Sequence, residues 1–449
     1  MNRLWTRVFL AGALALILLF FCNDFGIIDI QKTAIVVAIG VDKSQTDENA
    51  YDVTAQIAIP VSSGSSGADA ACQITVKNAK TIGEAVAKVN SETGWFPTLV
   101  YCRLVLFSKD TVERNVFDAL DYFLRSNFVP DTALVAVVEE RCEKVLSSKS
   151  PINDMSSTAI TKTLSSEAQK SGTVLASNLR DFAKGYYSPS SSGAIPFIQM
   201  KTSSEEQSDA GGSGKSQQSF IKADGNSQTV AKTKSLPFAV GYTNPLSKLS
   251  NKKFKRWRFA PIPLPLSSSA SSGGKSQEKP NVFNASKTAL FKDGVMVATL
   301  DEEQTLALNL ATAKIKLATF EVPVEKESRT YVLQVKTEKQ KQKLKIDEDK
   351  NVFKISIECS AEIIDASKAT DIEDITKSQL VKKDVLVSAE KYLTEKLKEV
   401  FEKARESKAD VFGIQQNLYR YCYKHYERLK DGILDSVFAD YDIKFINFR

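Results

Sequence analysis

The chain has one residue near its amino terminus whose type and position favour a defined chemistry, and that residue is Cys22. It ends an uncharged apolar run, residues 8–21, that follows two arginines. As a helix this run would span about 21 Å, which is less than the roughly 30 Å hydrocarbon layer of a bilayer. A basic start followed by a short apolar run is typical of an export signal. Cleavage before Cys22 would leave its thiol free to accept a diacylglyceryl lipid, so we expect Cys22 to be a membrane tether.

A retained anchor helix is the alternative interpretation of residues 1–21. In that case the two arginines and Trp5 would flank the apolar run with side chains that reach the membrane interface. Leu19 fits the usual lipidation signal, whereas two phenylalanines stand directly before Cys22, where that signal has small residues. Both interpretations place the rest of the chain outside the cytoplasm and attach it to a membrane.

The other residues of reactive type are not spaced for catalysis or for metal binding. The six cysteines are widely spread without a C-x-x-C pair, and the single histidine is His425. This excludes a multi-histidine metal site and removes Ser-His-Asp chemistry over most of the chain. The segment GGSGKS (211–216) lacks the first glycine of a phosphate-binding loop, because that position is Asp209. Glu302 and Glu303 are better explained as charges at a helix start. We therefore expect no enzyme activity, no metal and no cofactor.

One segment, NKKFKRWRFA (251–260), concentrates positive charge and aromatic rings. On a membrane surface its cations would meet anionic lipid and its rings would lie at the interface, with about 1 kcal/mol for each basic residue. A solvated linker with ordinary charge clustering is the alternative. Nucleic acid is not expected as a partner, because an exported protein rarely meets it. The candidate membrane contacts are Lys252, Lys253, Lys255, Arg256, Trp257 and Arg258.

The sequence predicts an α+β protein of several domains, with mixed sheets, packed helices and a low-complexity insert between the N- and C-terminal parts. The expected regions are a signal peptide or anchor (1–21), an N-terminal α/β domain (22–200), a Ser/Gly/Lys-rich insert (201–284) and a C-terminal α+β region (285–449) that could divide into 285–325 and 326–449.

Apolar patterning predicts the main elements of the N-terminal region. Residues 33–44 and 50–60 predict a hairpin, because β-branched and apolar side chains run between polar turns. Residues 98–108 predict one buried strand, and residues 112–125 predict one amphipathic helix. Residues 152–200 favour a helix followed by irregular structure.

Local signals mark where several elements begin or turn. Thr81 and Glu84 have the spacing of a capping box, which predicts a helix start. The residues Lys-Asp-Gly at 292–294 predict a tight hairpin turn, and Asp301 is expected to cap the next helix. Residues 378–407 predict a long helix with one apolar face.

Four of these segments together resemble the Ger(x)C family, the C-subunit lipoproteins of bacterial spore germinant receptors. The last two segments are the more specific, and the match spans nearly the whole chain outside the insert. The segments are Cys22 with Asp24, the hairpin residues Val36, Ile39, Gly40, Asp42 and Lys43, the stretch ALFKDGVMVATLDEEQT (289–305), and the stretch SKADVFG (407–413).

The resemblance implies a non-enzymatic subunit on the outer face of the spore's inner membrane, beside a multispan A subunit and a transporter-like B subunit. Such a complex responds to small nutrients, and its C subunit would act through protein contacts. Two other function classes stay open. A solute-binding lipoprotein that captures the germinant would need a pocket of several hundred cubic ångströms with convergent polar groups. An exported hydrolase would need paired carboxylates in a cleft.

Overall fold

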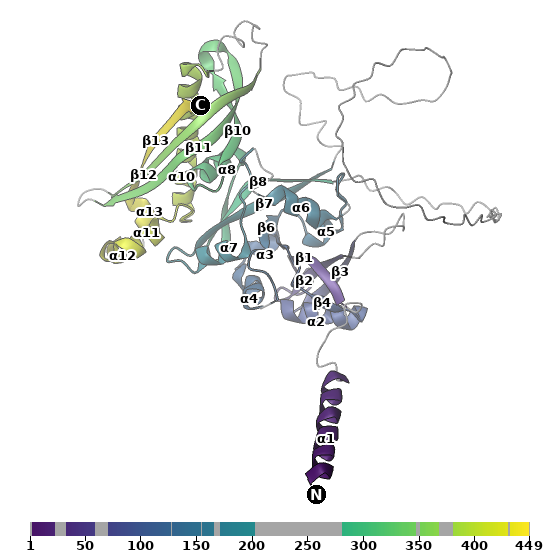
Figure 1. Ribbon diagram of the computed structural model, residues 1–449. Helices are drawn as coiled ribbons and strands as arrows, with labels where there is room; N and C mark the ends of the chain where they lie inside the picture. The colour runs from purple at the N-terminus through teal and green to yellow at the C-terminus, as the bar shows by residue number, and fades with distance from the viewer. Residues whose placement is uncertain are drawn as a thin grey trace, which may run out of the picture. The chain divides into compact units, whose positions relative to one another are not determined.

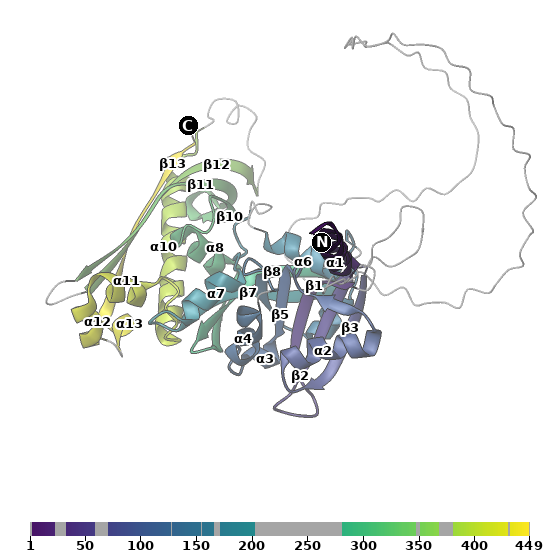
Figure 2. The ribbon, with the colours of Figure 1, turned by 60° about the horizontal axis from the view of Figure 1, so that its bottom comes forward.

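The structure, a computed structural model, describes ten stretches of the chain and confirms the predicted α+β class with two mixed sheets and packed helices (Figures 1 and 2). The candidate contacts from Lys252 to Arg258 lie outside the described residues. The described residues are 2–22, 33–58, 71–126, 128–153, 155–165, 171–202, 281–346, 351–367, 380–429 and 432–448.

In the described part of the chain, nine strands form the first sheet, in the order β3-β2-β1-β5-β6-β7-β8-β9, with β4 paired to β1. Its centre is parallel, from β4 and β1 through β5 and β6 to β7, and antiparallel strands flank it on both sides. The strands are β1 (Thr33–Lys43), β2 (Tyr51–Ala58), β3 (Ala71–Ala79), β4 (Phe96–Thr98), β5 (Leu104–Ser108), β6 (Leu134–Val138), β7 (Ser192–Thr202), β8 (Asn281–Lys292) and β9 (Val295–Leu300).

Helices cover both faces of this sheet. Alternate residues of β5 and β6 point to opposite sides, so Phe107 packs in one cluster with α2, α4 and α7, and Leu106 packs in another with α5 and α6. Burial on both faces explains why these short strands are continuously apolar. The helices are α2 (Ile82–Thr93), α3 (Lys109–Val112), α4 (Phe117–Arg125), α5 (Cys142–Ser147), α6 (Ser156–Leu164) and α7 (Leu179–Tyr186).

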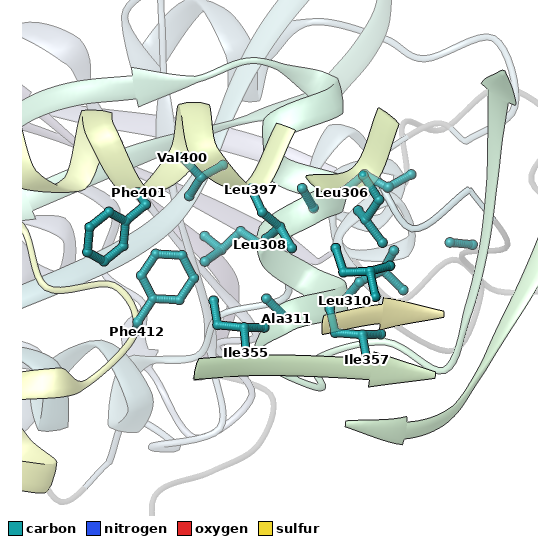
Figure 3. Packing of buried hydrophobic residues seen from close by; sticks show 14 of the residues in the cluster. Leu306, Leu308, Leu310, Ala311, Ile355, Ile357, Leu397, Val400, Phe401 and Phe412 are labelled. Carbon is teal, nitrogen blue, oxygen red and sulfur yellow. The ribbon is translucent and has the colours of Figure 1, made fainter. Parts of the chain in front are cut away.

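The second sheet has four strands, in which β10, β11 and β12 are antiparallel and β13 runs parallel to β12. The helices α8 and α10 pack against it and bury one continuous core (Figure 3). The remaining elements are α8 (Glu302–Ala311), β10 (Leu317–Val324), a 3-10 turn (Glu325–Glu327), β11 (Arg329–Ile346), β12 (Asn351–Ala366), α10 (Lys383–Glu406), α11 (Ile414–Tyr421), α12 (Tyr423–Leu429), α13 (Ile433–Ser436) and β13 (Val437–Asn447).

Three N-terminal predictions were wrong in detail. The strand expected at 98–108 is two strands, β4 and β5, separated by a bend in which Val100 and Tyr101 are exposed. The helix expected at 112–125 is broken into α3 and α4, because the N–H of Val116 donates to the carbonyl of Gly294 (2.8 Å) instead of continuing a single helix. The end of the segment expected to be irregular is β7, which pairs with β8 from the other side of the insert.

Helix α1 (Asn2–Cys22) covers the predicted signal peptide or anchor. Among the helices that the structure describes, none is both long enough and apolar enough to cross a membrane.

Candidate functional site

The structure does not place the residues that were predicted to contact a membrane. Cys22 is the last residue of α1, but its side chain lies outside the description, and so do Asp24 and the basic segment 252–258. The other resemblance segments are described, and they hold buried polar groups at three points of the fold.

The first point is the end of β1, where the carboxylate of Asp42 is completely buried. It accepts the N–H groups of Cys142 (2.7 Å) and Glu143 (3.1 Å), which begin α5. The Arg141 guanidinium lies 3.9 Å from Asp42 and 2.7 Å from the carboxylate of Asp52. Burial raises the pKa of Asp42, and the two N–H groups and Arg141 oppose that rise. These contacts fix α5 against the sheet.

Gly40 in the same strand allows this close approach. A Cβ atom at this position would lie 2.4 Å from the Cβ of Cys142, so helix α5 would have to move away. Glycine is therefore required here for packing. Its backbone does not have a positive φ angle, so conformational freedom is not the reason.

The second point is the β8–β9 hairpin and the helix that follows it. Asp293 and Gly294 have φ angles of 51° and 84°, as a tight turn between antiparallel strands requires. Asp301 and Gln304 form a reciprocal capping box at the start of α8. The Gln304 amide also donates to Glu399 (2.9 Å) and accepts from Lys403 (2.8 Å), so the cap is tied to α10.

The third point is Asp410, in the stretch SKADVFG. Its carboxylate is buried and accepts the N–H groups of Ile414 (2.9 Å) and Gln415 (2.7 Å) at the start of α11. Its own N–H donates to the hydroxyl of Ser192 in β7 (3.0 Å), which joins the helical segment to the first sheet. Burial raises the pKa of Asp410, and the surrounding N–H groups oppose the rise. Phe412 packs against Phe401, with ring centroids 6.1 Å apart (Figure 3).

A cavity of about 390 Å³ lies at this junction, and we call it the seam cavity. It is lined by α7, β7, α11 and the end of α8. Lys184, Lys314 and Arg420 contribute positive charge, and Asp181 contributes negative charge. The buried Asp410 also faces it, but the oxygens of this carboxylate already accept backbone N–H groups.

A second cavity, of about 530 Å³, lies where the β1–β2 turn meets the start of α2 and the α3–α4 region, and we call it the N-terminal cavity. Glu48 is paired with Lys43 (3.5 Å) and with Arg114 (3.3 Å). Within the described part of the chain, Lys80, Asp110 and Asp118 take part in no ion pair, so the lining offers one cation and two carboxylates.

The pKa of the Tyr51 phenol is affected by two charged residues of this cavity. Burial raises the pKa of Tyr51, and the negative charge of Asp118 raises it further, while Arg114 lowers it. A tyrosine hydroxyl, a carboxylate and a guanidinium therefore act on one another in this lining. Such a set suits a small solute that carries both charges.

Two family models match most of the chain. The family described as "Spore germination protein N-terminal domain" matches residues 26–200, and the family described as "Spore germination B3/ GerAC like, C-terminal" matches residues 286–446. The chain belongs to the Ger(x)C family. A solved structure named "Crystal Structure of the GerBC protein" is similar to it, with a TM-score of 0.47 and 13% identity over 94% of this chain and 100% of that chain. No curated protein matches the chain.

Membership of the Ger(x)C family gives the chain a role in spore germination. The structure shows what the described Ger(x)C segments do physically: they cap helices and close turns. Sequence reasoning missed both cavities, because their lining residues come from separate elements and share no local motif. The one local signal was the α2 cap, which places Lys80 at the rim of the N-terminal cavity.

Proposed function

We propose that this Ger(x)C protein is the membrane-tethered, extracytoplasmic subunit of a nutrient germinant receptor. It acts through protein contacts with multispan A and B subunits on the outer face of the spore's inner membrane, and it is required for germination. Family membership is the observation that carries the proposal.

A role without catalysis is supported by the structural contacts of three acidic side chains. Glu303 is paired with Lys396 at 2.8 Å, and Asp42 and Asp410 accept backbone N–H groups. Among the described residues, no group of three or more His, Cys, Asp or Glu side chains could hold a metal ion. These carboxylates serve structure, so the proposed activity is recognition.

The tether in this proposal is a lipid on Cys22, and the basic segment 252–258 makes a second contact with anionic lipid. One acyl chain alone binds a membrane only marginally, whereas two signals together give stable attachment. The sequence provides both signals, a thiol after an export signal and a basic cluster with aromatic rings.

Spores that lack this protein should lose dipicolinate release in response to one group of nutrients, and they should respond normally to a non-nutrient trigger. The reason is that a receptor subunit acts before the release machinery, which it does not replace. Dipicolinate release over a panel of amino acids and sugars measures this directly.

The variant Cys22→Ser should reproduce the loss, because the thiol that accepts the lipid is gone. The matched control is Cys72→Ser, which changes a half-buried free cysteine in β3 and should respond as the unchanged protein does. Normal release to every nutrient in spores without the protein would contradict the proposal.

The N-terminal cavity supports a second candidate function, direct capture of the germinant. Its volume lies within the range of small-molecule sites, roughly 300–1,000 Å³, and Lys80 and Asp118 could pair with the carboxylate and the ammonium group of an amino acid.

If this second function holds, an amino acid at a hundredfold excess over its Kd should stabilise the full chain by about 2.7 kcal/mol, because it binds the folded state alone. Thermal unfolding with a panel of amino acids measures the shift. Asp118→Asn should remove it, and Asp131→Asn, an exposed acid outside the cavity lining, should leave it in place. No shift with any amino acid would exclude capture of this ligand class.

A further inference from the structure

One edge of the first sheet collects exposed apolar side chains. The strands β1, β4, β5 and β6 are parallel and run in one direction, and β4 and β5 pair one after the other along β1, with Phe96 opposite Thr33 and Leu104 opposite Ala38. Phe96 is paired with Thr33, the first residue of β1, and Leu104 is paired with Leu134. The chain that enters β1 therefore arrives beside the start of β4, and the bend between β4 and β5 follows further along β1.

Five large apolar residues at the starts of β4, β5 and β6 or in the segments before these strands are about half exposed or more, and we call them the apolar edge. Val100 and Tyr101 line one hollow with Pro130, which brings the bend before β6 beside the bend before β5. A soluble surface rarely gathers such side chains without a binding role. The residues and their exposed fractions are Trp95 (49%), Phe96 (48%), Val100 (49%), Tyr101 (57%) and Phe128 (68%).

The backbone holds Trp95 in place although its side chain is exposed. Helix α2 ends at Gly94 with φ of 73°, which turns the chain back toward the sheet. The Trp95 carbonyl accepts the Asn90 amide (3.0 Å), and the Trp95 N–H donates to the Thr93 hydroxyl (3.1 Å). The ring is thus presented from a fixed backbone.

Positive charge accompanies the apolar edge. Arg103 and Lys162 are both exposed, and they share a hollow with Tyr101. The exposed carboxylates of Glu92 and Asp131 lie three residues along the chain from Trp95 and Phe128, respectively, and Asp131 is paired with Arg180. Aromatic rings at the interface with cations toward lipid phosphate form the pattern of a membrane-contacting surface.

The chain between Cys22 and Thr33 is long enough to let the apolar edge reach a membrane to which Cys22 is attached. Eleven residue steps separate Cys22 from Thr33, and a fully extended chain of that length reaches at most about 40 Å. A lipid on Cys22 would therefore allow Thr33, which is paired with Phe96 of the apolar edge, to lie at the bilayer and would hold it within about 40 Å of Cys22.

We propose that the apolar edge rests on the bilayer surface, with the aromatic rings of Trp95, Phe96 and Tyr101 in the interface and with Arg103 and Lys162 on anionic headgroups. The inference rests on the proposed membrane tether and deepens it, since it assigns the face of the protein that meets the lipid.

The test uses the protein with its lipid on Cys22, reconstituted in vesicles of equal parts phosphatidylglycerol and phosphatidylcholine with brominated acyl chains. The double variant Trp5→Phe, Trp257→Phe leaves Trp95 as the only tryptophan. Flotation of the vesicles reports the tether, and quenching of fluorescence by bromine reports contact of the ring with lipid. The matched control removes all three tryptophans and adds Tyr421→Trp, at a site on α11 that is 80% exposed.

We expect the chain to float with the vesicles, with strong quenching of Trp95 and a shift of its emission to shorter wavelength, while the Tyr421→Trp control stays unquenched. Flotation without quenching of Trp95 would overturn the inference and leave the tether standing, and the apolar edge would then face water or another protein. Equal quenching of both variants would also overturn it, as the sign of unspecific adsorption. A chain that fails to float would overturn both the tether and the lipid-facing edge.

Discussion

Replacing Asp410 by alanine should lower the free energy of unfolding of the full chain by about 2–4 kcal/mol. The substitution removes the acceptor of two N–H groups, from Ile414 and Gln415, at the start of α11. Ile414 is completely buried, so we expect the hydrogen bond lost by its N–H to be the larger part of the cost. Urea unfolding followed by circular dichroism measures the change.

Two further variants separate this effect from a general loss of charge. Asp410→Asn keeps one carbonyl oxygen as an acceptor, so its loss should be smaller than that of Asp410→Ala. Asp435→Ala removes an exposed carboxylate from the first turn of α13 and should change stability by less than about 0.5 kcal/mol. Equal effects of Asp410→Ala and Asp435→Ala would show that the buried carboxylate does not hold α11.

Replacing Leu397 by alanine should lower the free energy of unfolding by about 2–5 kcal/mol. The Leu397 side chain is completely buried between α10 and the second sheet, in the same cluster as Leu308 and Ile355 (Figure 3). Truncation removes apolar contacts and leaves a cavity that the surrounding strands cannot fill without moving. The same urea titration measures this loss.

The matched control lies on the same helix. Val387 is 51% exposed, so Val387→Ala removes an aliphatic side chain of α10 without opening a cavity and should cost less than about 0.5 kcal/mol. Alanine is a better helix former than valine, so helix propensity cannot cause a loss in Val387→Ala. A loss as large for Val387→Ala as for Leu397→Ala would therefore contradict the assignment of this stability to packing on the sheet.

Local chemistry in the sequence predicted several elements correctly. The Thr81 hydroxyl accepts the N–H of Glu84, and the capping box at Asp301 has both of its hydrogen bonds. The turn at Lys292-Asp293-Gly294 joins two antiparallel strands as expected. The apolar face of the predicted helix at 378–407 is the buried face of α10. These signals lie within a few residues of one another, so a single stretch of sequence contains all the groups that interact.

Breaks and pairings between distant segments could not be predicted in this way. The boundary between α3 and α4 depends on the carbonyl of Gly294, which lies far along the chain from Val116. The strand β7 was missed because its partner β8 lies beyond the insert. Elements whose hydrogen-bond partners are remote carry only a weak local pattern, since tertiary contacts decide their conformation.

The sequence by itself determined the α+β class, the family, the helix caps and the hairpin turns, because each rests on residue types at short spacing. Only the tertiary structure decided how the described family segments are used, with Asp42 and Asp410 as buried acceptors that hold helices to sheets. It also decided that Phe96 lies opposite the start of β1 and that the bend with Tyr101 lies beside the bend before β6. Parallel pairing of strands that are far apart in sequence brings these residues together, and no local pattern records that pairing.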